Sequence, residues 1–293
     1  MAERQFNHPE AIVTAAWLAD HLGDPALRIY DTTTYLHYTP GADKPYTVES
    51  GRADYDKAHI PGSAFLDLQG ELSDSASPYR FTILPPDELA QRFAARGIGD
   101  DTRVILYSRG NMQWATRIWW MLRYVGFDNA AILDGGWDNW AAEGLPVASD
   151  TTTYPPATLT PRPRPELFVG RDAVSSAIGN TAVCTINALS ADLHSGANDR
   201  YGRPGRIPGS VNVPAADLQL GDRKLLASPE AISDRFASVG ADPAGRVIVY
   251  CGGGIAATLD AFLLHQLGYQ DIAVYDNSMS EWAKDASLPI ETD

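Results

Sequence analysis

Two segments 147 positions apart share one pattern: His59-Ile60-Pro61-Gly62-Ser63-Ala64 and Arg206-Ile207-Pro208-Gly209-Ser210-Val211. Further matches follow in the same order, at offsets of 142 to 143. The apolar run Val104-Ile105-Leu106-Tyr107 returns as Val247-Ile248-Val249-Tyr250, and Asp134 with Trp140 returns as Asp276 with Trp282. Similarity at a fixed period is the signature of a repeated structural unit. The sequence therefore predicts two copies of one fold, with small loop insertions causing the drift in offset.

The length of the chain agrees with two copies. Its 293 residues are too many for one typical core and suit two cores of about 140 residues each. We expect a first domain over 1–148, a linker over 149–165 and a second domain over 166–293. The linker is rich in Thr and Pro, and proline stiffens an extended chain, so we expect it to hold the halves at a set separation.

Composition excludes several classes of protein. A formal charge of −14 and a pI near 4.7 argue against binding along nucleic-acid phosphates. The two cysteines, Cys184 and Cys251, rule out a disulfide framework and a Cys-rich metal site. We see no signal core and no apolar stretch long enough to span a membrane, so we expect a cytoplasmic protein without a metal or other cofactor.

Strand-like and helix-like patterns alternate in the second copy. Short β-branched runs predict strands over 182–186, 246–250 and 272–275. Amphipathic or capped segments predict helices over 229–239, with Ser228 as N-cap, and over 255–267 and 279–283. Such alternation predicts an α/β fold, in which each copy is a mainly parallel sheet flanked by helices. Ligands of such sheets bind outside the carboxyl ends of the strands, which points to the turn after Tyr250.

That turn has the composition of an anion-binding loop. Cys251 ends the predicted strand, and the loop continues as Gly252, Gly253, Gly254, Ile255, Ala256 and Ala257. Successive N–H groups of a glycine-rich turn form a concavity for an anion, and the following helix N-terminus adds positive charge. A thiolate is stabilised in such surroundings. We therefore predict that Cys251 is a nucleophile, whereas Cys184, in mid-strand, is a core residue.

Two other readings of the turn are weaker. Gly252, Gly254 and Ala257 loosely match a dinucleotide-binding fingerprint, but that motif belongs to the first strand of a long βαβ series and only 42 residues follow Cys251. A cysteine phosphatase needs an arginine six positions after its cysteine, and Ala257 stands there.

Taken together, these segments resemble the tandem rhodanese family, the thiosulfate and 3-mercaptopyruvate sulfurtransferases. The resemblance covers nearly the whole chain and includes the ATRIWW string at 115–120. It implies two tandem rhodanese-like domains, of which the first is catalytically silent because Ser108 stands where a nucleophile would be. It also implies that Cys251 carries a sulfur as a persulfide, taken from a small donor and passed to a thiol or cyanide acceptor, with a thioredoxin-like reductant as one candidate.

The chain departs from the family at several positions. Gly252 and Gly253 leave the loop neutral, whereas thiosulfate-type loops carry basic residues and the mercaptopyruvate type has a serine at the position of Gly253. Leu189 falls where that type has a donor-binding arginine. We expect substitutes among Arg200, Arg203 and Arg206, and Asp67 matches a family acidic residue near the cleft between the domains. These departures leave open a second reading, a rhodanese-fold protein that only binds or regulates.

Overall fold

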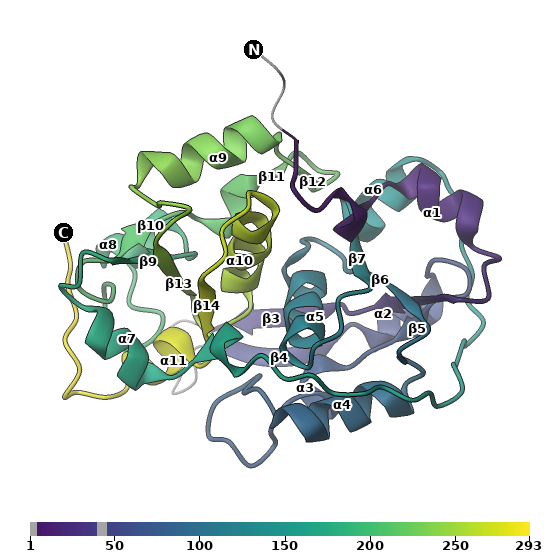
Figure 1. Ribbon diagram of the computed structural model, residues 1–293, viewed down its shortest axis with the longest axis horizontal. Helices are drawn as coiled ribbons and strands as arrows, with labels where there is room; N and C mark the ends of the chain where they lie inside the picture. The colour runs from purple at the N-terminus through teal and green to yellow at the C-terminus, as the bar shows by residue number, and fades with distance from the viewer. Residues whose placement is uncertain (1–4, 40–45) are drawn as a thin grey trace.

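The computed structural model describes residues 5–39 and 46–293 and contains one five-stranded sheet in each half (Figure 1). The first sheet has the order β1 (Ile12–Val13), β7 (Ala130–Leu133), β6 (Arg103–Tyr107), β2 (Leu27–Asp31) and β5 (Ala64–Phe65). The second repeats it as β8 (Phe168–Val169), β14 (Ile272–Tyr275), β13 (Arg246–Tyr250), β9 (Val183–Asn187) and β10 (Val211–Asn212). All neighbours in both sheets pair in parallel, which confirms the predicted α/β class and the repeat.

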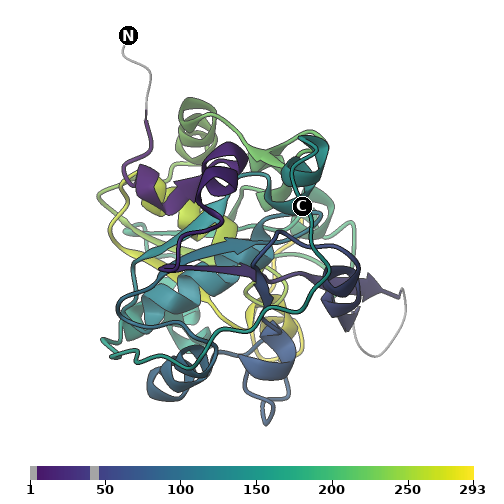
Figure 2. The same ribbon diagram turned by 90° about the vertical axis from the view of Figure 1, so that its right-hand side faces the viewer.

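Helices cover both faces of the first sheet (Figure 2). Along β6, Ile105 and Tyr107 belong to a core with α1 (Ala15–His21) and α6 (Gly136–Ala142). Val104 and Leu106 point to the opposite core, because successive strand side chains face opposite ways. That core includes residues of α4 (Pro86–Ala95) and α5 (Gln113–Tyr124). A strand buried on both faces explains why β6 and β13 read as continuous apolar runs.

The remaining elements complete the two copies. The first half also has the helices α2 (Arg52–Lys57) and α3 (Leu68–Glu71) and the antiparallel pair β3 (Thr34–Tyr38) and β4 (Tyr46–Ser50). The second half has α7 (Arg171–Ala177), α8 (Ala191–Ser195), α9 (Pro229–Ser238), α10 (Ala256–Gln266) and α11 (Ser278–Trp282), and the pair β11 (Gln219–Leu220) and β12 (Leu225–Leu226). Ser228 caps α9 as predicted, and the predicted bounds of the other elements hold to within one residue.

The two halves pack directly on each other. α5 and α10 lie side by side at their boundary, where Thr116 Oγ1 and Thr258 Oγ1 are 3.0 Å apart (Figure 1). Residues 149–164 instead run along the first half, where Ala157 N–H donates to Ala94 O at 2.9 Å and Arg162 N–H to Val125 O at 2.8 Å. This segment therefore packs on the first half, while α5 and α10 make a direct contact between the halves.

Residues 5–39 and 46–293 contain neither a membrane-spanning helix nor a cluster of metal-binding side chains. No helix there has both the length and the hydropathy that crossing a membrane requires. No group of three or more His, Cys, Asp or Glu side chains there is placed to hold a metal ion.

Candidate active site

The loop from Cys251 to Ile255 joins β13 to α10, and its carbonyl groups point away from the pocket. Met279 N–H donates to Cys251 O at 3.1 Å, and Ser280 N–H donates to Gly252 O at 2.8 Å. Arg117, which comes from α5 in the first half, donates from Nη1 to Gly254 O at 3.0 Å. Three of the five loop carbonyls are thus fixed by α11 and by the opposite copy.

Four of the five N–H groups of the same loop form no hydrogen bond with the described part of the chain. Cys251 N–H donates to Ser278 Oγ at 3.0 Å, but those of Gly252 to Ile255 donate to no acceptor within the described part of the chain. Gly254 has φ +71°, and a Cβ there would overlap Asp276 O, so only glycine fits. With carbonyls bound on one side and N–H groups free, the loop offers an anion-binding concavity beside Cys251.

Cys251 opens into a small pocket of about 60 Å³ between the two halves. The thiol residue is only 2% exposed, as suits a nucleophile kept from bulk water. The wall combines apolar and aromatic side chains of both copies, among them Leu36, Tyr38, Tyr46, Trp114, Leu189 and Tyr201.

Three tyrosines line the Cys251 pocket, in which the sequence predicted arginines as ligands for the donor. Burial raises the pKa of Tyr38, and it raises that of Tyr46 to about 12. The pKa of Tyr201 is also raised well above its usual range, chiefly by burial. All three therefore stay neutral and can donate O–H hydrogen bonds at neutral pH. Tyr201 packs so closely on the loop that a Cβ at Gly252 would overlap its Oη. No motif marked these residues, because they come from distant segments.

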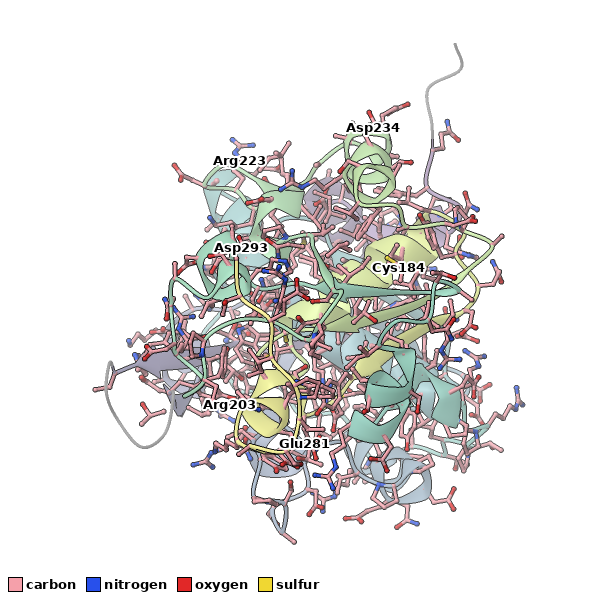
Figure 3. All side chains as sticks on the ribbon, turned by 90° about the vertical axis from the view of Figure 1, so that its left-hand side faces the viewer. Cys184, Arg203, Arg223, Asp234, Glu281 and Asp293 are labelled. Atoms are coloured by element: carbon pink, nitrogen blue, oxygen red, sulfur yellow. The ribbon has the colours of Figure 1, made fainter. Side chains whose placement is uncertain are left out.

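Two of the three expected arginines are engaged elsewhere. Arg203 donates to four backbone carbonyls of the C-terminal segment at 2.6–2.9 Å, those of Trp282, Ala283, Asp285 and Leu288 (Figure 3). Arg206 pairs with Glu291 and Asp293 at 2.6 Å. Their expected role in the pocket is corrected to one of anchoring the C-terminus. Arg200 lies nearer the site, with its guanidinium 3.9 Å from the ring centroid of Tyr38.

The structure also places Asp67, Leu189 and Cys184, which the sequence analysis named. Asp67 is the N-cap of α3 and accepts from Gly70 N–H at 2.8 Å, and it does not line the Cys251 pocket. Leu189 does line it, so an apolar side chain stands where the family arginine was expected. Cys184 lies in β9 and is half-buried rather than fully buried, and burial raises the pKa of its thiol (Figure 3).

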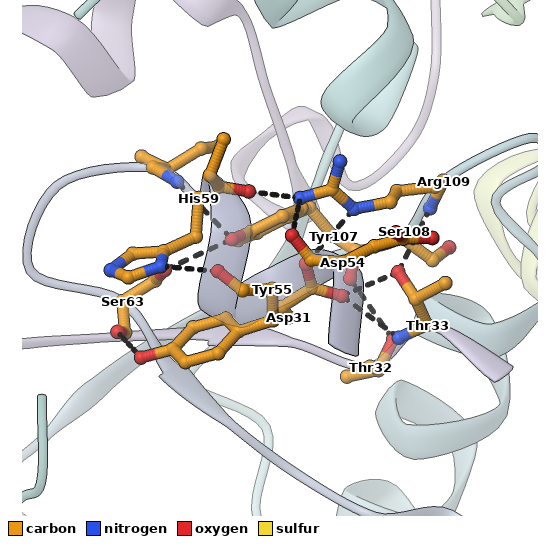
Figure 4. A network of polar contacts seen from close by, with 12 residues as sticks. Asp31, Thr32, Thr33, Asp54, Tyr55, His59, Ser63, Tyr107, Ser108 and Arg109 are labelled. Atoms are coloured by element: carbon orange, nitrogen blue, oxygen red, sulfur yellow. Dashed lines mark hydrogen bonds and ion pairs between the residues drawn. The ribbon is translucent and has the colours of Figure 1, made fainter. Parts of the chain in front are cut away.

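In the loop of the first copy that corresponds to the cysteine loop, the backbone N–H groups donate to side chains of the protein itself. Ser108 Oγ donates to Asn111 O at 2.6 Å, within its own loop (Figure 4 shows the surrounding polar network). Three N–H groups of this loop have acceptors at 2.7–3.1 Å: Arg109 donates to Thr33 Oγ1, Gly110 to Asp138 Oδ2 and Met112 to Gln219 Oε1. Three backbone N–H groups therefore have hydrogen-bond acceptors in the Ser108 loop, whereas their counterparts in the Cys251 loop have none within the described residues.

Comparison with known proteins agrees with this architecture. The rhodanese-like domain matches residues 14–143 and 192–285. The 3-mercaptopyruvate sulfurtransferase of Escherichia coli is 31% identical over 95% of this chain and 97% of its own, and the thiosulfate sulfurtransferase of Rattus norvegicus is 30% identical over 96% and 94%. The crystal structure of SseA from Escherichia coli, described as a 3-mercaptopyruvate sulfotransferase with the rhodanese fold, superposes with a TM-score of 0.78, 29% identity and coverage of 92% of this chain and 98% of its own. The chain belongs to the rhodanese family and carries its domain in two copies.

Proposed function

We propose that this protein is a sulfurtransferase that moves a sulfane sulfur from a small donor, through a persulfide on Cys251, to an acceptor. Its relatives over nearly the whole chain are 3-mercaptopyruvate and thiosulfate sulfurtransferases. The observation that carries the assignment is the loop itself, in which the four consecutive N–H groups that follow Cys251 donate to no acceptor in the described part of the chain. Such a preorganised cradle stabilises an anionic sulfur as an oxyanion hole stabilises oxygen.

The reaction divides into two transfers. The thiolate of Cys251 attacks the outer sulfur of the donor, so that a new S–S bond forms while the donor's C–S or S–S bond breaks. The departing pair of electrons leaves on pyruvate, which takes up a proton, or on sulfite. A thiol or cyanide then attacks the outer sulfur of the persulfide and regenerates the thiolate, which is covalent catalysis in two steps. The loop residues Gly252 to Ala257 hold the sulfur throughout.

The first copy has no part in the chemistry. Ser108 replaces the nucleophile, and Asp138, Thr33 and Gln219 take the N–H groups that a persulfide would need. We therefore assign residues 1–148 as a silent domain, 149–165 as a linker and 166–293 as the catalytic domain. The silent copy still contributes Tyr38 and Tyr46 to the pocket.

The acceptor and compartment follow from the same thiol chemistry. A small thiol, cyanide or a thioredoxin-like reductant is the proposed acceptor, since each supplies a nucleophile for the outer sulfur. Both cysteines are free, which suits a reducing compartment, and we propose the cytoplasm.

Donor treatment should add 32 mass units, one sulfur atom, to Cys251 and none to Cys184. Cys251 lies in the N–H cradle, whereas the thiol of Cys184 has a raised pKa and no such donors around it. Intact and peptide mass spectrometry after incubation with 3-mercaptopyruvate or thiosulfate measures the label. Sulfur on Cys184 alone would overturn the assignment, and the absence of label from every donor would favour a purely binding or regulatory role.

We expect 3-mercaptopyruvate to be preferred over thiosulfate by roughly ten- to a hundredfold in kcat/KM. A neutral loop with tyrosine hydroxyls lacks the cationic side chain that a dianion needs, and one charge-assisted hydrogen bond is worth about 1.5–3 kcal/mol. Steady-state rates with both donors, measured side by side, check this. A native preference for thiosulfate would contradict the argument and implicate Arg200.

Adding a cation to the loop gives a second arm of that test. Gly252→Arg alone is unsuitable, because its Cβ would overlap Tyr201 Oη. The substitution is therefore made in a Tyr201→Ala background, with Tyr201→Ala as its control. The added arginine should shift the ratio of kcat/KM values toward thiosulfate, and an unchanged ratio would show that loop charge does not select the donor.

A further inference from the structure

A second and larger pocket lies beside the cysteine loop. It measures about 230 Å³ and is lined in the second half by Ser280 of α11 and by Lys284. The first half contributes Tyr46, Gln69, Asp74, Ser75, Ser77, Pro78, Tyr79 and Arg80. It shares only Tyr46 with the lining of the Cys251 pocket. The two spaces are thus neighbours separated by one aromatic wall.

A buried hydroxyl group forms part of the wall of this pocket. Ser280 is 7% exposed and lines the cavity, and its hydroxyl pairs with that of Tyr46: burial raises the pKa of Tyr46, and the hydrogen bond with Ser280 offsets part of that rise. The Oγ lies 3.8 Å from the point that a Cβ on Gly253 would occupy, so it sits next to the loop. A serine hydroxyl has one donor and two acceptor sites, so a single contact with Tyr46 leaves it able to bind a further group.

The lining is locally cationic in an acidic protein. Arg80 and Lys284 line the pocket, and neither forms an ion pair with a residue that the structure describes. Asp74 is the one acidic residue of the lining, and its Oδ1 already accepts from Ala76 N–H at 2.8 Å. Two free cations against one carboxylate favour an anionic occupant in a chain of net charge −14.

The first copy shows what fits at this position. α6 and α11 are equivalent, because Gly136 and Ser278 share a positive φ, 53° and 50°, and Trp140 and Trp282 donate to matching proline carbonyls at 2.9 and 2.8 Å. At the position of Ser280, α6 has Asp138, whose carboxylate accepts from Gly110 N–H at 2.7 Å. The first copy therefore places its own carboxylate where the second has a short hydroxyl and a cavity.

We propose that this second pocket binds a small carboxylate-bearing molecule. One carboxylate accepts a hydrogen bond from Ser280 Oγ and takes the place that the Asp138 side chain takes in the first copy. Arg80 and Lys284 supply the counter-charges. The site adjoins the Cys251 pocket at Gly253, whose N–H is the counterpart of the Gly110 N–H that Asp138 binds in the first copy, and its occupation does not depend on sulfur transfer.

Malonate binding to the Cys251→Ser variant tests the proposal. This variant carries no sulfur, so a failure of the proposed enzymatic function leaves the binding result unaffected. Isothermal titration should give saturable one-to-one binding of malonate and none of the neutral malonamide. Arg80→Gln and Lys284→Gln should each raise Kd by about three- to fivefold, as expected for a partly exposed ion pair of up to ~1 kcal/mol.

Substitutions at Ser280 make the test specific. Ser280→Asp copies the first domain and should abolish malonate binding, because its own carboxylate fills the site. Ser280→Ala removes the hydroxyl without adding charge and should weaken binding, which keeps the test valid if the aspartate variant does not fold. Arg235→Gln is the charge control. It removes a surface cation of α9 that pairs with Asp217, and it should leave Kd unchanged. The absence of saturable binding, or binding that the Arg80, Lys284 and Ser280 variants leave unchanged, would overturn the proposal.

Discussion

Replacing Cys251 with serine should abolish sulfur transfer and leave the fold intact. Serine occupies nearly the same space in the core as cysteine, and the hydrogen bonds of position 251 are made by its backbone, with Ser278 Oγ and Met279 N–H. A serine hydroxyl is a far weaker acid and cannot hold a second sulfur as a persulfide. We expect the rate to fall to the background level of the uncatalysed reaction, with an unchanged denaturant midpoint. Steady-state transfer with both donors and equilibrium unfolding measure the two quantities.

The chain provides two matched controls for that experiment. Cys184→Ser removes the other thiol and should keep activity near that of the native protein. Ser108→Cys places a thiol at the corresponding position of the first copy, where Asp138, Thr33 and Gln219 already hold the loop N–H groups. It should therefore gain no persulfide in a Cys251→Ser background. Wild-type transfer by a well-folded Cys251→Ser variant would move the chemistry to another residue.

The strands, the helices and the reactive loop were predictable because their signals are local. A run such as Val247 to Tyr250, buried on both faces, is recognisable from composition, and Ser228 followed by Pro229 marks a helix start by capping chemistry alone. The internal repeat supplied a second example of the apolar strand pattern, at 104–107 and 247–250. The loop between β13 and α10 was also predictable, because a strand that ends in a run of glycines marks a turn.

The side chains around the loop were not predictable in the same way. Tyr38 and Tyr46 reach the Cys251 pocket from the paired strands β3 and β4, and Tyr201 reaches it from the segment after α8, so no local pattern links them to the cysteine. Arg203 and Arg206 failed as substrate ligands for a related reason. A nearby position in sequence does not reveal that backbone carbonyls and carboxylates of the C-terminal segment already hold them. The occupation of the N–H groups in the Ser108 loop likewise involves a long-range contact, that of Gln219 with Met112 N–H.

Arg117 is the main polar link between the two copies, and its loss should be the most destabilising single change. Its side chain is fully buried and donates to three acceptors of both halves: Gly254 O at 3.0 Å, Phe81 O at 2.7 Å and Asp276 Oδ1 at 2.6 Å. Asp276 Oδ2 also accepts from Ile83 N–H at 2.8 Å. Arg117→Met would leave the buried carboxylate without its cation, which typically costs about 3–5 kcal/mol of unfolding free energy.

The same substitution should slow sulfur transfer even in the folded protein. Gly254 O loses its donor, so the loop that orients the N–H cradle can shift, and displacements of about 1 Å at such sites cost up to ~100-fold in rate. We expect kcat to fall by about ten- to a hundredfold at a temperature where circular dichroism shows the native fold. Equilibrium denaturation and steady-state kinetics on one preparation separate the effect on stability from that on the loop.

A double-mutant cycle with Asp276→Asn assigns the cause of the instability. If the uncompensated charge dominates, Arg117→Met combined with Asp276→Asn should recover at least about 1 kcal/mol relative to Arg117→Met alone, because coupled residues are not additive. Arg171→Met, which breaks the exposed pair with Asp285, is the matched control and should cost at most ~1 kcal/mol. An Arg117→Met protein that unfolds at the native denaturant concentration would contradict the role of this ion pair. Full stability combined with lost activity would instead assign Arg117 to the positioning of the loop, since Gly254 O is the one of its three contacts that belongs to the loop.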